Sequence, residues 1–166
     1  MGIIEGMYNE VYHATAGISS SAVKAVYKKS LAHWKGEKRS QTAAFTMGTA
    51  IHSLLLEEDR DLVVKGPKTK ASAAFKTMKD DLLEDQVLLT EVEYNVAHRV
   101  AKGALDNPTC KAALRHKDRR NEVSIFAKDP RSGLVLKTRP DLMIESEQTV
   151  YDVKSTQDAS PQGFAS

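Results

Sequence analysis

The sequence Arg139-Pro-Asp-Leu-Met-Ile-Glu-Ser-Glu-Gln-Thr-Val-Tyr-Asp-Val-Lys154 predicts a β-hairpin, and the rest of the chain can be arranged around it. Residues 142–144 and 149–153 are rich in aliphatic and β-branched side chains, which is typical of strands. The polar residues 145–148 between them indicate a turn. Antiparallel strands of this kind place particular side chains directly opposite one another.

The register of the hairpin would bring two carboxylates face to face. With a two-residue loop at 146–147, Asp141 stands opposite Asp152. Directly opposite side chains share one face of a sheet, with Cβ atoms about 4.5–5.5 Å apart. Because side chains alternate along a strand, Lys154 is expected on the same face as Asp152. The other face is predicted to point into a core and carries Leu142, Ile144, Tyr151 and Val153.

This arrangement of charges predicts a metal site. Two facing carboxylates repel unless a cation lies between them or one of them holds a proton. Hard oxygen ligands of this kind suit Mg²⁺ or Mn²⁺. The Lys154 ammonium has only donors and cannot be a ligand, but it can position an attacking water and offset charge on a phosphate. Pro-Asp followed by Asp-x-Lys on the next strand indicates a metal-dependent phosphodiesterase. The alternative is a hairpin at the protein surface whose acids and lysine are solvated and have no catalytic role.

Composition sets limits on the remaining possibilities. A chain of 166 residues that is 41% hydrophobic and 28% charged is long enough for one globular domain with a sizeable core. The formal charge of +2 is too small to indicate a nucleic-acid partner by itself, so local clusters matter more. Basic clusters lie at residues 65–70 and 111–120, and each could either hold phosphates or form a solvated face.

The environment of the protein is indicated by what the sequence lacks. The single Cys110 excludes an internal disulfide and fits a reducing compartment. No Cys-x-x-Cys pair is present, so a structural zinc site is not expected. No apolar run approaches 18 residues and the N-terminus does not resemble a signal peptide, so we expect a cytoplasmic protein without a membrane partner.

A helix expected at about residues 43–58 carries the second informative pattern. Phe45, Gly48, His52 and Leu55 fall on one stripe at helical spacing. A glycine inside a helix costs about 1 kcal/mol, which suggests that something approaches the backbone closely at Gly48. The sheet edge that bears the two acids could be this neighbour, and His52 would then supply a nitrogen ligand to the same metal. A histidine satisfied within the core is the alternative.

Two expectations concern the N-terminal part of the chain. Residues 1–16 are expected to be an irregular or strand-like entry with Tyr8 and Tyr12 as anchors. Serines 19–21 offer N-caps for a helix with an apolar stripe at helical spacing, made of Val23, Val26, Tyr27 and Leu31.

Further elements follow from capping and alternation. Helices are expected at 71–84, at 90–105 with a capping box formed by Thr90 and Glu93, and at 108–114 after Pro108. The buried side chains expected in the first of these helices are Phe75, Met78, Leu82 and Leu83. Strands at 122–128 and 134–139 would complete a mostly antiparallel β-meander packed against these helices. Glu122, at the start of the first of these strands, is either an ordinary exposed acid or a residue near the metal.

With Gly48-Thr-Ala-Ile-His52, Arg139-Pro-Asp141 and Asp152-Val-Lys154-Ser-Thr156 in this order, the chain resembles the PD-(D/E)xK nuclease superfamily. Within it, the sequence is similar to the RecE-like exonucleases, the exodeoxyribonuclease VIII group and its phage relatives. This likeness extends to Tyr8-Asn-Glu-Val-Tyr-His13 and Gly17-Ile-Ser-Ser-Ser21. It implies an α/β (α+β) fold with a restriction-endonuclease-like core, here as a single nuclease domain over residues 1–166. The group continues beyond the Asp-x-Lys strand with a helix carrying Gln and Tyr, so residues 157–166 are expected to be a tail or the start of a missing C-terminal part.

The resemblance also implies an activity and the residues that perform it. The expected activity is that of an exonuclease that hydrolyses phosphodiester bonds from double-stranded DNA ends, 5′ to 3′, for phage-type recombination. Mg²⁺ is the implied cofactor and Mn²⁺ may substitute for it. The implied ligands are His52, Asp141, Asp152 and the backbone carbonyl of Val153, with Lys154 as the catalytic lysine. The residues expected to hold the DNA backbone are Lys65, Lys68, Lys70 and Arg139.

The same resemblance implies partners and leaves alternatives open. Family members often form rings around DNA and act with a single-strand annealing protein, so both are expected partners in addition to double-stranded DNA. The implied location is the cytoplasm of a bacterial host cell. An alternative from another class is a non-catalytic DNA-end binding or assembly module that retains the nuclease fold. A third possibility is an endonuclease of the same superfamily.

Overall fold

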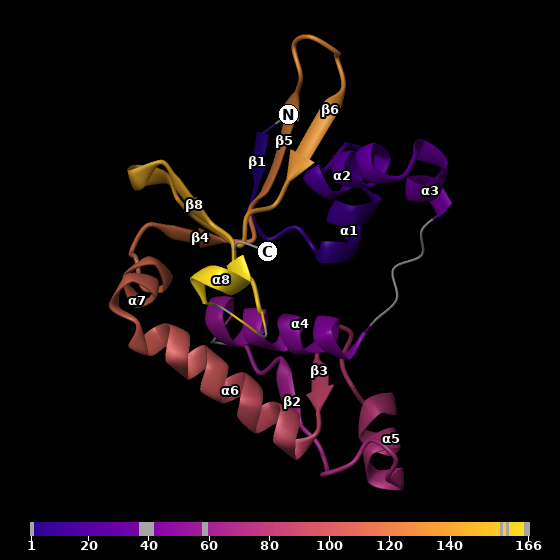
Figure 1. Cartoon of the computed structure of the whole chain (residues 1–166), viewed down its shortest axis with the longest axis vertical. Helices are drawn as coiled ribbons and strands as arrows, with labels where there is room; N and C mark the ends of the chain where they lie inside the picture. The colour runs from indigo at the N-terminus through magenta and orange to yellow at the C-terminus, as the bar shows by residue number, and fades with distance from the viewer. Residues whose placement is uncertain (1, 37–41, 58–59, 157, 159, 165–166) are drawn as a thin grey trace. The chain divides into compact units, whose positions relative to one another are not determined.

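The computed structural model describes residues 2–36, 42–57, 60–156, 158 and 160–164. The chain divides into two compact units, whose elements are labelled in Figure 1. The first unit comprises Met1–Ser40 and His116–Asp152, and the second comprises Gln41–Arg115 and Val153–Ser166. Both units combine helices with strands, so the mixed α and β class expected from the sequence is confirmed. The single domain over residues 1–166 stays a prediction.

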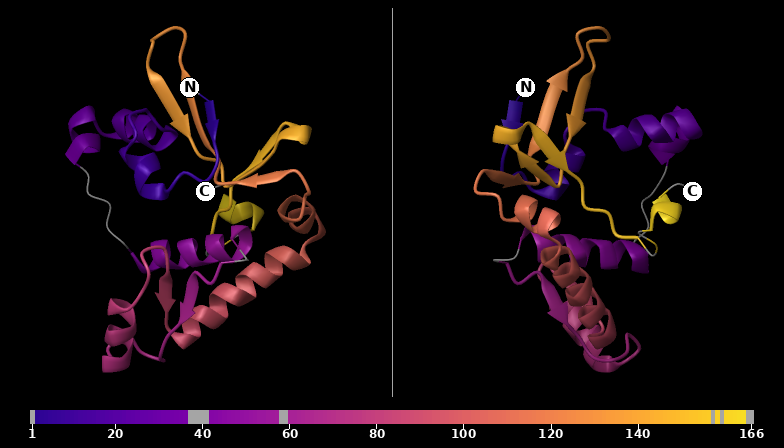
Figure 2. Two further views of the ribbon diagram at one scale, coloured as in Figure 1. Left: turned by 180° about the vertical axis from the view of Figure 1, so that it is seen from behind. Right: turned by 60° about the vertical axis from the view of Figure 1, so that its left-hand side comes forward.

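The first unit contains two three-stranded sheets, with strand orders β1-β5-β6 and β4-β7-β8, and its strand pairings are antiparallel. The sequence predicted one continuous meander, but the chain leaves one sheet after β6 and enters the other at β7 (Figure 2). Pro140, which lies between these strands, has no N–H to donate to a ladder, and this favours a break there. The elements are β1 (Gly2–Ile4), α1 (Asn9–Ala14), α2 (Ser20–Lys28), α3 (Leu31–Gly36), β4 (Arg119–Asn121), β5 (Ser124–Lys128), β6 (Val135–Thr138), β7 (Leu142–Ile144), η1 (Glu145–Glu147) and β8 (Thr149–Tyr151).

The N-terminal segment was expected to be anchored by two tyrosines, and one of them fulfils this role. Tyr12, in α1, is 7% exposed and its ring packs 6.1 Å from that of Phe126, centroid to centroid. Tyr8 is 76% exposed, so the expectation that it is an anchor is wrong. Tyr8 occupies the N-cap position of α1, outside the helical turns that pack inward.

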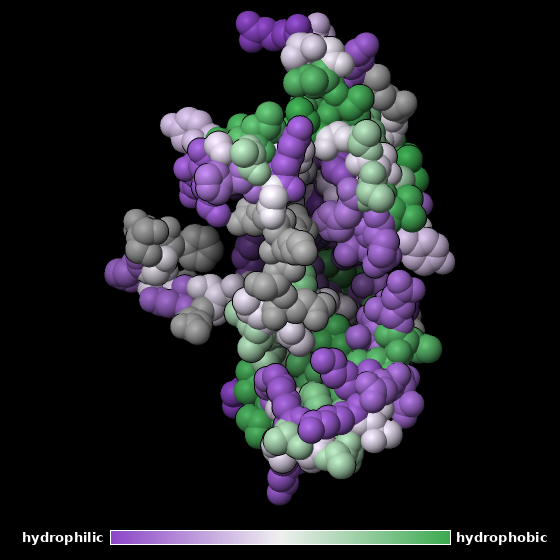
Figure 3. Space-filling model, turned by 90° about the vertical axis from the view of Figure 1, so that its right-hand side faces the viewer, coloured by the Kyte–Doolittle hydropathy of each residue, from purple (hydrophilic) through white to green (hydrophobic). Residues whose placement is uncertain are grey.

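The β5–β6 hairpin carries apolar residues at the surface. Its turn is closed by the Asp129 N–H, which donates to the Leu134 carbonyl at 2.9 Å, and by left-handed Gly133, with φ of 72°. Figure 3 shows hydrophilic residues at the hairpin tip, at the top of the view, with hydrophobic residues directly below them. Exposed hydrophobic residues of this sheet include Ile3, Ile4, Leu134, Val135 and Leu136.

The second unit is built around a parallel strand pair covered by two helices. β2 and β3 pair with Val63 opposite Val87, and helices α4 and α6 pack against each other and against this pair. Ala50 and Ala97 are fully buried, because small side chains let the two helices approach closely. The elements are α4 (Ala43–Leu56), β2 (Val63–Lys65), α5 (Ala73–Asp80), β3 (Val87–Leu89), α6 (Glu91–Asp106), α7 (Pro108–Leu114) and α8 (Pro161–Phe164).

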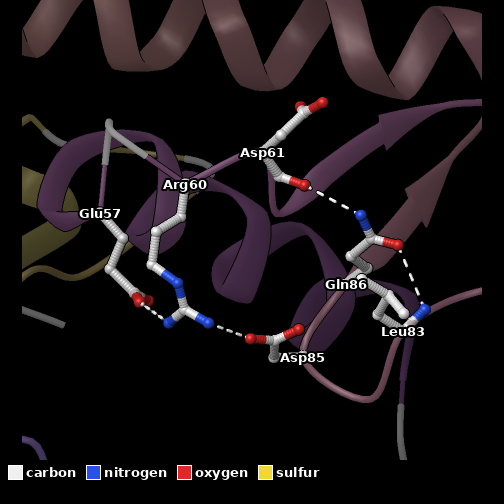
Figure 4. Close-up of polar contacts among 6 residues, drawn as sticks. All are labelled: Glu57, Arg60, Asp61, Leu83, Asp85 and Gln86. Carbon is white, nitrogen blue, oxygen red and sulfur yellow. Dashed lines mark hydrogen bonds and ion pairs between the residues drawn. The ribbon is translucent and has the colours of Figure 1, made fainter.

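Polar contacts join the segment before β2 to the turn before β3 in the second unit (Figure 4). The Arg60 guanidinium lies between Glu57 and Asp85 and forms an ion pair with each of them. The Gln86 amide donates to the Asp61 carbonyl at 3.0 Å and accepts from the Leu83 N–H at 3.1 Å. Arg60 has a half-exposed side chain, so its ion pairs add only modest stability and chiefly fix the course of the chain.

The predicted helix over 71–84 is shorter in the structure. Helix α5 begins after Ser72, whose hydroxyl accepts from the Phe75 N–H at 3.2 Å, and it ends at Asp80. Phe75 is buried as expected, but Leu83 is 66% exposed, so its expected burial is wrong. Leu83 lies beyond the end of α5, where helical spacing no longer determines which side chains point inward.

The capping box expected at the start of α6 is present. The Thr90 hydroxyl accepts from the Glu93 N–H at 3.3 Å, and the Glu93 carboxylate accepts from the Thr90 N–H at 3.0 Å. Burial acts to raise the pKa of Glu93, but hydrogen bonds from Lys70 and Thr90 outweigh burial and hold this pKa below its usual value. Folding therefore favours the ionised form of Glu93.

This linkage predicts an acid-sensitive contribution to stability. Because the folded-state pKa of Glu93 is lowered, its contribution is present above the unfolded value, near 4.5, and is lost as the pH falls through the folded value. We expect Glu93→Gln to lower the free energy of unfolding by about 1 kcal/mol at pH 7. The difference from wild type should shrink below pH 4.5, as measured by urea unfolding at several pH values. A pH-independent difference would contradict the prediction, and exposed Glu84→Gln is the control.

Among the residues that the structure describes, no helix combines the length and the apolar character that crossing a membrane requires.

Candidate functional site

Two acidic residues lie at the ends of neighbouring strands of the β4-β7-β8 sheet. Strands β7 and β8 pair with Leu142 opposite Tyr151. The hairpin register derived from the sequence is confirmed for these strands, and the facing position of Asp141 and Asp152, one residue beyond the paired ladder, stays a prediction. Asp141 is half-buried and Asp152 is exposed. The first unit therefore offers oxygen donors of the kind that a hard divalent ion prefers.

The loop of this hairpin is longer than the two residues expected. Residues 145–147 form the short 3₁₀ helix η1, and Gln148 adopts a left-handed conformation with φ of 52°. The Gln148 N–H donates to the Glu145 carbonyl at 3.0 Å, which closes the turn before β8 begins. The loop takes one more residue from each strand than expected, so the register of the strands is unchanged.

Burial in the hairpin follows the sequence only in part: Leu142 and Ile144 are buried, but so is Met143 between them, and β8 departs from the expected pattern. Leu142 and Ile144 are each 1% exposed, as expected. Tyr151 is 36% exposed, so its expected burial is wrong, because β8 is an edge strand with a neighbour on one side only. Since β8 ends at Tyr151, strand alternation does not extend to Lys154. The placement of Lys154 on the same face as Asp152 stays a prediction.

A third acid, Glu122, lies directly after β4, the strand that pairs with the other side of β7. β4 pairs with β7, and the Glu122 N–H donates to the Asp141 carbonyl at 3.0 Å. Glu122 has a φ of 50°, a left-handed conformation that costs about 1–3 kcal/mol for a residue with a side chain. Backbone strain of this kind is concentrated at functional sites. Of the two alternatives left open for Glu122, a role near the two aspartates is therefore favoured over that of an ordinary exposed acid.

The second unit contains a contact between the candidate histidine and the segment that follows Asp152. The Nε2–H of His52, on α4, donates to the carbonyl oxygen of Val153 at 2.8 Å. A carbonyl can only accept, so this contact fixes the proton on Nε2. The partly buried His52 therefore faces the backbone group that was expected to bind the metal with it.

The glycine one turn before His52 faces the same segment. A Cβ at Gly48 would lie 3.3 Å from the Ser155 hydroxyl oxygen, which is tighter than an ordinary contact. The sequence predicted that something approaches the α4 backbone at this glycine, and this prediction is confirmed. The neighbour within the second unit is residues 153–155, the continuation of the Asp-x-Lys motif.

The chemistry of this donor pair fits a divalent ion. Cis ligands of an octahedral Mg²⁺, each at about 2.1 Å, are about 3.0 Å apart. The 2.8 Å between His52 Nε2 and the Val153 oxygen is close to this separation. A neutral histidine binds a metal through its unprotonated nitrogen, so His52 would bind the ion through Nε2 with its ring proton on Nδ1. Within the described part of the chain, no group of three or more His, Cys, Asp or Glu side chains is arranged to hold an ion.

The basic cluster at 65–70 is partly neutralised within the second unit. Lys65 forms an ion pair with Glu91 at 3.0 Å, and Lys70 forms one with Glu93 at 2.6 Å. The hydrogen bond from Lys65, followed by the charges of Lys65 and Lys68, lowers the pKa of Glu91. These lysines are thus engaged with α6, and their expected role in holding DNA stays a prediction.

The basic cluster at 111–120 contains a strand that the sequence did not indicate. Arg119 and Arg120 belong to β4, and Arg120 forms ion pairs with Glu145 at 2.9 Å and Glu5 at 3.3 Å. The acidic residues on neighbouring segments reduce the charge available to phosphates. Pairing with β7 gives β4 its strand conformation, a long-range contact that the local charge pattern does not reveal.

Arg139, expected to contact DNA, has partners within the first unit. Its guanidinium donates to the Ser124 hydroxyl at 2.8 and 3.0 Å and to the Met7 carbonyl. It also lies over the Tyr12 ring, 4.6 Å from the centroid. Ser124 is completely buried and Tyr12 nearly so. Arg139 therefore joins the N-terminal segment to β5, and its DNA contact stays a prediction.

Lys137 has a related position in the first unit. Its ammonium donates to the carbonyls of Tyr12 at 2.8 Å and Thr15 at 2.7 Å, at the C-terminal end of α1. A cation at this end of a helix satisfies carbonyls that have no partner within the helix. This role could not be predicted from the sequence, because α1 and β6 are far apart along the chain.

The family described as a PDDEXK-like domain of unknown function (DUF3799) matches residues 19–166. This match covers most of the chain and includes His52, Asp141, Asp152 and Lys154. None of the curated proteins compared with the chain matches its sequence. The match agrees with the resemblance to the PD-(D/E)xK nucleases at the level of the superfamily.

Proposed function

Because the chain belongs to the PDDEXK-like domain family, we propose that it is a metal-dependent nuclease that hydrolyses phosphodiester bonds in DNA. The observation that carries this proposal is the 2.8 Å contact between His52 Nε2 and the carbonyl of Val153, the central residue of the Asp152-Val153-Lys154 motif. A histidine satisfied in the core could take any acceptor as its partner, whereas the partner of His52 is the central residue of the Asp-x-Lys motif. The contact with this motif favours the ligand role over the core role.

The proposed ligands are His52, Asp141, Asp152 and the carbonyl oxygen of Val153. When bound, the divalent ion would polarise the scissile phosphate and lower the pKa of a bound water. The two carboxylates supply the negative charge that holds the ion, and the histidine and carbonyl supply neutral donors. Glu122, whose N–H donates to the carbonyl of Asp141, is a further acid that could orient a water beside these ligands.

Lys154 has the role of a cation beside the reacting phosphate. Its ammonium can hydrogen-bond the attacking water, so that the oxygen lone pair faces phosphorus. The same charge can stabilise the additional negative charge that develops on the phosphate oxygens in the transition state. Lys154 is exposed, so water and a phosphate can reach its ammonium.

We propose double-stranded DNA ends as the substrate, with hydrolysis from 5′ to 3′, in recombination of the phage type. Support for this finer assignment comes from the similarity of the N-terminal segment and the motif order to the RecE-like exonucleases. A ring of identical subunits and a single-strand annealing protein as partner belong to the same proposal. Mg²⁺ is the proposed cofactor, with Mn²⁺ as a substitute.

The activity can be tested with linear and closed circular duplexes of the same sequence. The linear duplex carries a label at either the 5′ or the 3′ end, and each substrate is incubated with Mg²⁺, Mn²⁺ or EDTA. The expected result is metal-dependent loss of the 5′ label as mononucleotides, with the circle intact. Cleavage of the circle would replace the exonuclease proposal with an endonuclease. Binding of linear DNA without cleavage, even in Mn²⁺, would support a non-catalytic DNA-end module.

The role of His52 predicts a change in metal affinity that can be measured without DNA. His52→Ala removes the nitrogen donor, and we expect Mn²⁺ affinity to fall about 10–100-fold, the range seen when supporting groups of a metal site are lost. Mn²⁺ binding can be followed by electron paramagnetic resonance of the free ion. His33→Ala, on α3, is the matched control and should bind Mn²⁺ like wild type. Equal affinity of all three proteins would exclude His52 as a ligand.

A further inference from the structure

Helices α2 and α3 form a basic surface in the first unit, which we call the α2–α3 surface. No Asp or Glu occurs between Glu10 and Glu37, whereas this stretch contains four lysines. All four, Lys24, Lys28, Lys29 and Lys35, are exposed. A surface with cations and no acids of its own attracts polyanions, and the attraction does not depend on their sequence.

The same helices expose large apolar side chains among these lysines. Tyr27 is 90% exposed, Val23 is 55% exposed and, on α3, Leu31 is 52% exposed. Residues three or four apart are neighbours on a helix surface, so Tyr27 lies beside both Val23 and Lys24. The apolar stripe that the sequence places on this helix is therefore at the surface, while the small Ala22 is buried.

A hollow adjoins this surface. It has a volume of about 430 Å³ and is lined by Lys29, Ala32, His33 and Gly36, all from the α2–α3 segment. The His33 ring is held by the Ser30 hydroxyl, 2.7 Å from its Nδ1.

We propose that the α2–α3 surface binds single-stranded DNA. Lys24, Lys28 and Lys35 would contact phosphates, and the rings of Tyr27 and Trp34 would stack on unpaired bases. Single strands, unlike duplexes, offer base faces to aromatic side chains, and a groove that combines cations with aromatic residues is typical of such binding. The choice of nucleic acid as the partner rests on the proposed function, because a nuclease that digests one strand of a duplex generates the other as a single strand.

Two variants separate the phosphate contacts from the stacking. In EDTA, where no cleavage can occur, we expect Lys24→Gln/Lys28→Gln to bind a fluorescent thymidine 20-mer about tenfold more weakly than wild type. The slope of log affinity against log salt should fall by about 1.4, which corresponds to two lost contacts with single-stranded phosphates. Tyr27→Ala should weaken binding about tenfold, whereas Tyr27→Phe should retain it because the ring remains.

Matched controls exclude an effect of charge alone or of folding. Lys76→Gln/Lys79→Gln on α5 removes the same charge from exposed positions of the second unit and should leave affinity unchanged. Circular dichroism melting curves of all variants should coincide, because the substituted side chains lie at the surface. Equal weakening by the α5 variant, or no weakening by the α2 variants, would overturn the proposal.

The outcomes distinguish this inference from the proposed function. Loss of single-strand binding in the α2 variants, with no cleavage by wild type, would support the inference and contradict the nuclease. Cleavage by the wild-type protein, together with unchanged single-strand binding in the α2 variants, would support the nuclease and contradict the inference about the α2–α3 surface. A basic amphipathic surface can also bind anionic lipid, so sedimentation with phosphatidylglycerol vesicles completes the test. Vesicle binding that depends on Lys24 and Lys28, without binding to the oligonucleotide, would replace DNA with a membrane surface.

Discussion

Replacing Lys154 with alanine is expected to lower the rate of hydrolysis of linear duplex DNA about 10²–10³-fold, while DNA binding stays close to that of wild type. Loss of one group that stabilises charge developing in a transition state has an effect of this size. Lys154 is exposed and lies three residues beyond the end of β8, and substitutions at exposed positions usually change stability by less than about 0.5 kcal/mol. A lower rate of hydrolysis in this variant would therefore report a defect in the chemical step and not a loss of folded protein.

The measurement is the single-turnover rate of release of labelled mononucleotides in Mg²⁺, with enzyme in excess over DNA ends. Binding is measured separately in Ca²⁺ or EDTA. Lys79→Ala, an exposed lysine on α5, is the control for loss of a positive charge and should retain the wild-type rate. Degradation by Lys154→Ala at the wild-type rate would exclude the assigned role, even if the protein is a nuclease.

Replacing Arg139 with alanine is expected to lower the free energy of unfolding by about 3 kcal/mol. The substitution leaves the completely buried hydroxyl of Ser124 and the carbonyl of Met7 without the guanidinium as their donor, and an unsatisfied buried group costs about 1–3 kcal/mol. It also removes the cation from above the ring of Tyr12, a contact worth about 0.5–2 kcal/mol. The N-terminal segment would lose one of its attachments to β5.

Urea unfolding followed by far-UV circular dichroism measures this effect. The control is Arg131→Ala, an exposed arginine in the β5–β6 turn, which should change stability by less than about 0.5 kcal/mol. The sequence suggested that Arg139 contacts DNA, and the structure adds a role in packing. If Arg139→Ala is as stable as wild type but binds DNA weakly, the DNA contact is the principal role of this arginine.

Several local elements could be predicted from the sequence because their causes are local. The capping box of Thr90 and Glu93 depends on residues three positions apart, and the helix after Pro108 depends on the fixed φ of proline. The register of the β7–β8 hairpin followed from a short loop and the position of its apolar residues. An error in the loop length left the register unchanged, because both strands lost one residue.

Other features of the candidate site could not be predicted because they depend on contacts between distant parts of the chain. Glu122 lies beside Asp141 only through the pairing of β4 with β7. The sequence indicated a close approach at Gly48, but only the folded second unit identifies Ser155 as the neighbour. Likewise, the ion pairs of Lys65 and Lys70 with α6 could not be inferred from the basic cluster alone.

The sequence by itself determined the hairpin and its register, the capping of helix α6 and the superfamily to which the motifs point, because each depends on spacing along a short stretch. The tertiary structure decided that His52 meets the backbone of Val153, that Arg139 and Lys137 hold the N-terminal segment, and that the apolar stripe of α2 is exposed. These outcomes depend on which distant segments pack together. Periodicity identifies an apolar stripe, but only the folded chain determines whether that stripe is buried or remains at the surface.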